Sequence, residues 1–235
     1  ESDIETDSGA RWSVCGRQNH PWVAVCGPNA QWPCREEAGV RNEHKGIDSD
    51  DLFRTSNSRV FAIGDCASKF QFTNAADAQA RRVVPNALFF GIGGGKGSTL
   101  VMPWCTFTSP EVAHVGIAAD EVADAADSVE TITVPLASVD RAVLDGDADG
   151  YFRVHLAQGS DRILGATLVS DHAGETISEI TAAMTNGIGL TGLGATIHPY
   201  PTQAEAIRKA ADAYRRQRLT SRATRLFRLF FRMFK

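Results

Sequence analysis

The segment YFRVHLAQGSDRILGATLV, residues 151–169, decides the fold class of the second half of the chain. Two runs rich in β-branched, aromatic and aliphatic residues, 151–156 and 163–169, flank the turn-forming residues 158–161, and this pattern predicts a β-hairpin. Further elements are predicted as strands at 102–107, 113–117 and 131–134, a short acidic helix from Asp120, and helices at about 173–186 and 202–218. Because the strands precede the two long helices, we expect an α+β domain in which an antiparallel sheet carries helices on one face.

The first half of the chain shows a shorter α/β pattern. The apolar run 60–63 suits a buried parallel strand that ends at Gly64 and Asp65. We expect Thr73 or Asn74 to cap the helix that follows, and Pro85 to kink or end it. Residues 1–46 show neither helical nor strand periodicity, so we expect loop or disorder there.

Glycine-rich residues 91–97 mark the boundary between the two halves. The predicted organisation therefore has four parts, which are residues 1–46, 47–97, 98–218 and a basic tail, 219–235. The tail repeats arginine every three or four residues beside many Leu and Phe side chains, which is typical of an amphipathic helix on an anionic membrane surface. A helix docked on its own protein or on a dimer partner would show the same pattern.

The composition narrows the class of protein. Five cysteines with no Cys-x-x-Cys spacing argue against a disulfide scaffold and against a zinc or other metal site. The formal net charge of −4 divides into −13 for residues 1–205 and +9 for the last thirty, so we expect no nucleic-acid partner. The sequence has no long apolar run and no signal peptide, and it opens on Glu1 without an initiating Met. We therefore expect a cytoplasmic protein, the C-terminal part of a longer one, with peripheral binding to the inner face of the membrane through the tail.

The segment IHPYPTQAE, residues 197–205, places a phenol between two prolines just before a helix. Pro199 and Pro201 hold Tyr200 on a stiff, extended arm. Thr202 and Glu205 have the spacing of a capping box for that helix. Such an arm can position a side chain in a neighbour's cleft, or it can simply lead the chain into the helix.

Gly64 and Asp65 form the second candidate site. An acid at the carboxyl end of a buried strand can accept hydrogen bonds from a ligand hydroxyl, and the N-terminus of the next helix, at Asn74 and Ala75, offers N–H donors to an electron-rich group. The alternative is a carboxylate that only stabilises its own turn.

Other motifs have simpler interpretations. The GxGxxG match at 187–192 follows a helix instead of a strand, so we interpret it as a loop. Cys66 and Cys105 are expected to be small packing residues. His155 and His198 are expected at exposed polar positions.

Three groups of segments together resemble one family, the pyridine nucleotide-disulfide oxidoreductases. Residues 60–65 with FTNAA (72–76) are similar to its last flavin-binding segment, and PWCTFTSPEVAHVG (103–116) is similar to the start of its dimerisation domain. Residues 151–169, HAGE (172–175) and HPYPTQAE (198–205) continue that domain. The resemblance implies an FAD enzyme that passes electrons from NAD(P)H through the flavin to a cysteine pair. Residues 47–97 would then be the end of the FAD-binding domain, and 98–218 the dimerisation domain of a homodimer.

The resemblance also assigns roles to residues. Asp65, after Gly64, would bind the ribityl chain of FAD, and the helix at Asn74 and Ala75 would direct its amides at the isoalloxazine ring. Tyr200 occupies the position of the family's catalytic histidine, as in the mercuric reductase branch, and Glu205 matches the family's glutamate. Both would act in the partner's active site, with the phenol as a hydrogen-bond donor or weak ligand instead of a base.

The chain departs from the family in ways that bear on activity. It has no Cys-x4-Cys redox pair, no dinucleotide fingerprint after a strand, and no vicinal cysteines at its C-terminus. We therefore expect a portion of a mercuric reductase-like enzyme that does not turn over alone. The alternative is a non-catalytic dimerisation module whose basic tail binds a membrane surface.

Overall fold

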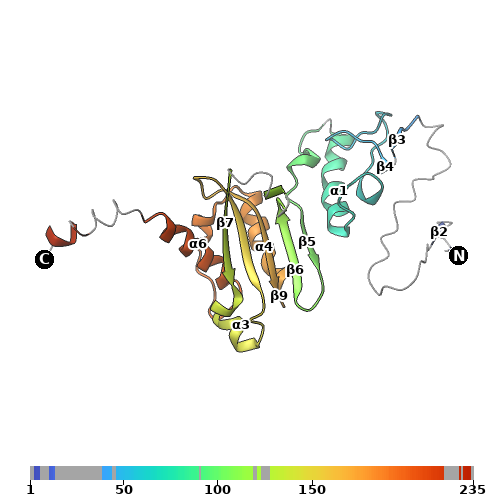
Figure 1. The fold of residues 1–235 in the computed structure, drawn as a ribbon. Coiled ribbons are helices and arrows are strands. Elements are labelled where there is room, and N and C mark those ends of the chain that lie inside the picture. Colours follow the sequence, from blue (N-terminus) through green and yellow to red (C-terminus); the bar gives the residue numbers. More distant parts are fainter. Residues whose placement is uncertain are drawn as a thin grey trace. The chain divides into compact units, whose positions relative to one another are not determined.

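The computed structural model describes residues 3–5, 11–13, 39–43, 46–89, 91–118, 121–122, 128–219, 228 and 230–233. The chain divides into two compact units, residues 1–100 and 101–235 (Figure 1). Most of the helix expected from Asp120, most of the segment 1–46 and most of the tail lie outside the described residues.

The second unit is built on a five-stranded antiparallel sheet. Its strands are β5 (Pro103–Thr106), β6 (Glu111–Gly116), β7 (Val129–Pro135), β8 (Tyr151–Ala157) and β9 (Ile163–Ser170), in the spatial order β5-β6-β9-β8-β7. The predicted hairpin is formed by β8 and β9, in which Tyr151 pairs with Val169 and Phe152 with Leu168. The strands predicted for this half are all present, and the α+β class is confirmed.

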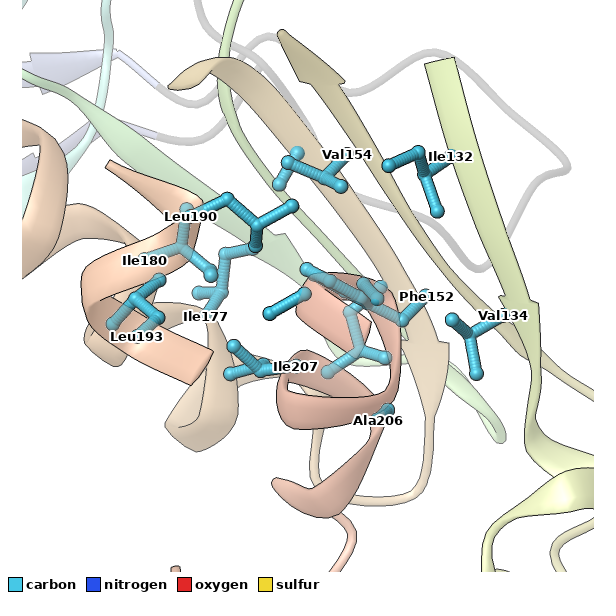
Figure 2. Close-up of a cluster of buried hydrophobic side chains, with 14 of the residues drawn as sticks. Ile132, Val134, Phe152, Val154, Ile177, Ile180, Leu190, Leu193, Ala206 and Ile207 are labelled. Atoms are coloured by element: carbon cyan, nitrogen blue, oxygen red, sulfur yellow. The ribbon is translucent and has the colours of Figure 1, made fainter. Parts of the chain in front are cut away.

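Helices cover one face of this sheet. They are α4 (Ala173–Thr185), α5 (Leu190–Ala195) and α6 (Glu205–Gln217), with α4 packed on β6 and β9 and α6 on β7 and β8. Successive side chains of a strand point to opposite faces, so Phe152 and Val154 of β8 both enter the core. Figure 2 shows these side chains facing Ile207 and other apolar residues of the helices. Burial of Phe152 alone contributes about 1.5–3 kcal/mol.

The connection from β7 to β8 carries a 3-10 turn, η4 (Leu136–Ser138), and a short helix, α3 (Asp140–Asp145). Leu136 and Ala142 bury this connection against the core. The helix ends at Asp145 and is followed by Gly146, whose φ of 78° is left-handed and therefore favours glycine. Asp140, the first residue of α3, is therefore held in a fixed position beside the core.

The first unit contains one long helix, α1 (Thr73–Leu88), and two 3-10 turns, η1 (Gly64–Cys66) and η2 (Gly97–Thr99). Two short antiparallel ladders complete it, β1 (Asp3–Glu5) with β2 (Arg11–Ser13) and β3 (Asn42–Glu43) with β4 (Gly46–Ile47). The expectation of loop throughout residues 1–46 is wrong for these strands, because ladders of two or three residues are too short to show periodicity.

Residues 60–63 do not form the expected parallel strand. Phe61 makes a single antiparallel bridge with Arg54, and no parallel pairing occurs among the described residues. An apolar run indicates burial, but it becomes a strand only where a neighbour offers a ladder.

The expected cap of α1 is also wrong, and of the two outcomes expected at Pro85, a kink or the end of the helix, the second does not occur. The helix begins at Thr73 itself, and the residue before it, Phe72, has no side chain that can cap. It continues past Pro85 to Leu88, since proline removes one N–H donor from the helix and leaves its own carbonyl free to accept from the N–H of Phe89 (3.0 Å).

Candidate functional site

The loop from α5 to α6, residues 197–204, is the predicted arm. Three of its side chains are hydrogen-bonded to carboxylates of three different parts of the second unit. These bonds join Nε2 of His198 to Oε1 of Glu179 in α4 (2.9 Å), the hydroxyl of Tyr200 to Oδ2 of Asp140 in α3 (2.9 Å), and Nε2 of Gln203 to Oδ2 of Asp147 before β8 (2.8 Å). The arm is therefore fixed by the tertiary fold as well as by its prolines.

Tyr200 projects from this arm with 73% of its surface exposed. Its hydroxyl donates to Asp140, and this hydrogen bond, followed by the charge of Asp140, raises the pKa of the phenol above its ordinary value. The nearby Glu205 adds to the rise. The phenol is therefore neutral near pH 7, and its one proton is held by a neighbouring carboxylate.

Glu205 is the first residue of α6, and it does not take part in a capping box. The hydroxyl of Thr202 instead donates to the carbonyl of Pro199 (2.8 Å), and no side chain caps α6. The carboxylate of Glu205 turns along its own helix, where Oε1 accepts from Nη2 of Arg208 (2.6 Å) and lies 3.7 Å from Nζ of Lys209. The predicted capping box is thus wrong, because both of its side chains have nearer partners.

One oxygen of Glu205 has no such partner. The residue is only 7% exposed, and its Oε2 has no hydrogen-bond donor among the described residues. A buried carboxylate oxygen without a donor is costly, about 1–3 kcal/mol or more. The site therefore has an unused acceptor within the first turn of α6.

Gln203 and Asp147 hold the base of the arm. Both are buried, and Oδ2 of Asp147 accepts from the side chain of Gln203 and from the backbone N–H of Asp171 (2.9 Å). Sequence reasoning missed the three carboxylates that hold the arm, because each lies far from it along the chain and in no motif.

The two histidines are not exposed, so that expectation is wrong. The side chain of His198 is 6% exposed, because its pairing with Glu179 draws it against α4. His155 is buried in β8, where its Nδ1 lies 2.9 Å from Oγ1 of Thr131, and burial lowers the pKa of the ring below its ordinary value.

The structure brings Gly64 against the first turn of α1. The φ of Gly64 is 70°, and a Cβ there would lie 3.4 Å from the Cβ of Ala76. Its N–H donates to Oε1 of the buried Gln79 (2.7 Å), whose Nε2 donates to Ser68 (3.0 Å). Gln79, which sequence reasoning missed, thus clamps the turn to the helix.

Asp65 and the start of α1 face solvent around this clamp. Asp65 is exposed, and its carboxylate has no hydrogen bond or ion pair with the described residues. Thr73 and Asn74 are exposed, Ala75 is fully buried, and the helix start has no side-chain cap. An exposed carboxylate thus lies beside the positive end of a 16-residue helix.

The described cysteines and possible metal ligands add no reactive centre. Cys66 and Cys105 are half-buried, and burial raises the pKa of both thiols. Within the described ranges, no three His, Cys, Asp or Glu side chains gather as metal ligands. No helix in the same part of the chain is long and apolar enough to cross a membrane.

Two family models match the chain. The dimerisation domain of the pyridine nucleotide-disulphide oxidoreductases matches residues 102–211, which hold the five-stranded sheet and its helices. A second model, described as pyridine nucleotide-disulphide oxidoreductase, matches residues 22–80. The fold and these matches define part of a pyridine nucleotide-disulphide oxidoreductase, including its dimerisation domain. The chain belongs to the pyridine nucleotide-disulfide oxidoreductase family, whose members depend on FAD and use NAD(P)H.

Curated relatives come from two branches. The mercuric reductases of Streptomyces lividans and Staphylococcus aureus are 33% and 31% identical over 76% and 78% of this chain. The dihydrolipoyl dehydrogenase of Chlamydia muridarum is 33% identical over 75%. The chain spans only 38%, 34% and 37% of the lengths of these three relatives.

Solved structures share the fold. LpdA from Mycobacterium tuberculosis is 26% identical with a TM-score of 0.71, over 80% of this chain and 40% of its own. The flavoprotein disulfide reductase RclA from Escherichia coli is 23% identical with a TM-score of 0.68, over 76% and 41%, a likeness of fold alone. The resemblance read from the sequence is confirmed.

Proposed function

We propose that this chain supplies flavin contacts and the dimer interface of an FAD-dependent, NAD(P)H-using oxidoreductase of the mercuric reductase-like kind. The observation that carries the proposal is the arm 197–204. It lies on a dimerisation fold, is fixed to three carboxylates, and presents Tyr200 to solvent. A side chain that is both well fixed and exposed is suited to act on something outside its own subunit.

The residues around Gly64 fit FAD. The carboxylate of Asp65 is an exposed acceptor suited to ribityl hydroxyls, and the uncapped start of α1 at Asn74 and Ala75 suits an electron-rich ring edge. Gly64 adopts a left-handed conformation that a side chain would strain. When bound, FAD supplies the electron-accepting centre between NAD(P)H and the cysteine pair; this chain's residues bind and orient it.

Tyr200 and Glu205 are proposed to act in the active site of the partner in a homodimer. The Oε2 of Glu205 supports this, because a donor from a second copy would satisfy a buried oxygen to which no described residue of its own subunit donates. The sequence holds no Cys-x4-Cys pair, so in this proposal the redox cysteines lie in another part of the whole enzyme.

Flavin binding and dimerisation are tested on the purified 235-residue chain with added FAD. We expect visible flavin absorbance to co-elute with a species of twice the chain mass. Asp65→Ala should weaken the FAD binding, whereas Asp77→Asn, an exposed acid on α1 that pairs with Arg81, should not. Colourless protein, or equal FAD binding by Asp65→Ala and wild type, would contradict the flavin contact, and a monomer would contradict the interface.

A second candidate function rests on the tail. Phe230, Phe231 and Met233 are helical and exposed, and Arg228 and Arg232 are exposed beside them. Apolar and cationic side chains on one short helix suit peripheral binding to an anionic membrane. Co-sedimentation with phosphatidylglycerol vesicles should lose most bound protein when residues 219–235 are deleted, and phosphatidylcholine vesicles should bind little of either form. Equal binding by both forms would rule out this role.

A further inference from the structure

The phenol of Tyr200 is hydrogen-bonded to Asp140, a residue to which no family resemblance or sequence motif assigns a role. The hydroxyl donates to Oδ2 of Asp140 at 2.9 Å, across 60 residues of sequence. We propose that Asp140 is a positioning residue that holds the phenolic proton of Tyr200, so that the phenol meets its ligand as a hydrogen-bond acceptor. This inference rests on the proposed role of Tyr200.

Both members of the pair are held by the same helix. Asp140 opens α3 directly after η4, and the carbonyl of Ser138 in η4 accepts a hydrogen bond from Nζ of Lys209 in α6 (2.6 Å). Tyr200 belongs to the arm that leads into α6, which begins at Glu205. The distance between the phenol and the carboxylate is therefore set by the packing of α6.

The chemistry of a phenol makes this pairing selective. A tyrosine hydroxyl has one proton to donate and oxygen lone pairs to accept with. A hydrogen bond to an ionised carboxylate is about twice as strong as a neutral one, so Asp140 keeps the proton in competition with a neutral acceptor. What remains for a ligand is the oxygen lone pairs.

The charges around the phenol favour the same class of ligand. Asp140 and Glu205 both place negative charge near the hydroxyl, and Glu205 is only partly offset by Arg208 and Lys209. A ligand that presents a hydrogen-bond donor or a positive charge fits this environment, and an oxyanion does not. The proposed site is thereby limited to thiols, protonated groups or cations.

The pair is tested by carbon-13 NMR of the full chain labelled at Cζ of its three tyrosines. Tyr200→Phe identifies the Tyr200 signal, whose pH titration reports ionisation of the phenol. We expect Tyr200 in the wild type to titrate above its ordinary value. Asp140→Asn should shift the midpoint downward, and Asp140→Glu should partly restore it.

Asp145→Asn is the matched control, since Asp145 ends the same helix and pairs with Arg141 instead. It should leave the Tyr200 midpoint unchanged. An unchanged midpoint in both Asp140→Asn and Asp140→Ala, with circular dichroism showing a folded chain, would overturn the proposal. The readout needs neither FAD nor turnover, so its failure is distinct from failure of the proposed function.

Discussion

The two units of this chain differ in how completely each buries its apolar side chains. Residues 101–235 close a continuous core between the sheet and its helices. In residues 1–100, by contrast, α1 buries the polar Gln79 and Asn86 while Val84 and Leu88 are exposed. The difference teaches that the dimerisation fold is stabilised by its own core, whereas the turn and the helix of the first unit are joined by specific hydrogen bonds.

The largest expected effect comes from removing bulk from the core of the second unit. Phe152→Ala should lower the free energy of unfolding by about 3–5 kcal/mol, because it leaves a cavity at a position that is only 1% exposed. Phe107→Ala, at a largely exposed position, is the control and should change stability by no more than about 0.5 kcal/mol. Urea unfolding followed by circular dichroism measures both, and equal losses would contradict the claim that the second unit is stabilised by its buried core.

A smaller loss is expected where two helices touch. A Cβ added at Gly194 in α5 would lie 2.5 Å from the Cβ of Ala211 in α6, so Gly194→Ala should cost about 1–3 kcal/mol through overpacking. Adding Ala211→Gly to the same chain should recover part of that loss. If thermal unfolding of the double variant shows no recovery, the close approach is not the cause.

In the first unit, the expected effect is local. Gln79→Leu keeps the volume but removes the acceptor of the Gly64 N–H, an effect of about 1–3 kcal/mol for a buried donor left alone. Hydrogen exchange should quicken at Gly64 while the core of the second unit keeps its protection. Exchange that quickens equally in both units would show that they unfold together.

The smallest effect concerns pH. Burial lowers the folded-state pKa of His155, whose unfolded value is near 6.5, so the unfolded chain binds the proton first as the pH falls. The stability contribution is present above pH 6.5 and is lost as the pH falls from there toward the folded pKa. His155→Gln should flatten that part of a stability profile measured by urea unfolding between about pH 7 and pH 5. An identical slope in the wild type and in His155→Gln would show that other groups cause the loss of stability at low pH.

The sequence predicts the parts of this molecule that follow from local pattern. The two β-forming runs around the turn residues 158–161 correctly indicate a hairpin, and the order of strands and helices indicates the sheet with one covered face. The chemistry of helix starts is predicted less well, since Thr202 and Glu205 both have partners nearer than each other. The spacing of a motif shows which side chains could form a hydrogen bond. It does not show whether another partner in the folded chain binds them instead.

The candidate site is less predictable still. Resemblance to the family points to Tyr200 and Asp65, but the residues that hold the two regions, Asp140, Asp147 and Gln79, follow from tertiary contacts alone. Each supplies a single hydrogen bond or two to a distant segment. No periodicity or motif encodes such a pairing, because its partners meet only once each unit has folded.

The three carboxylates that hold the arm have a consequence for how folding controls the exposed phenol. Glu179, Asp140 and Asp147 reach their positions only when α4, α3 and the turn before β8 have all taken their places. A chain with any one of them out of place would not hold Tyr200 where the hydrogen bonds of the arm place it. The exposure and orientation of Tyr200 are thereby coupled to the completion of folding, so that under the proposed function an incompletely folded subunit would lack a competent arm.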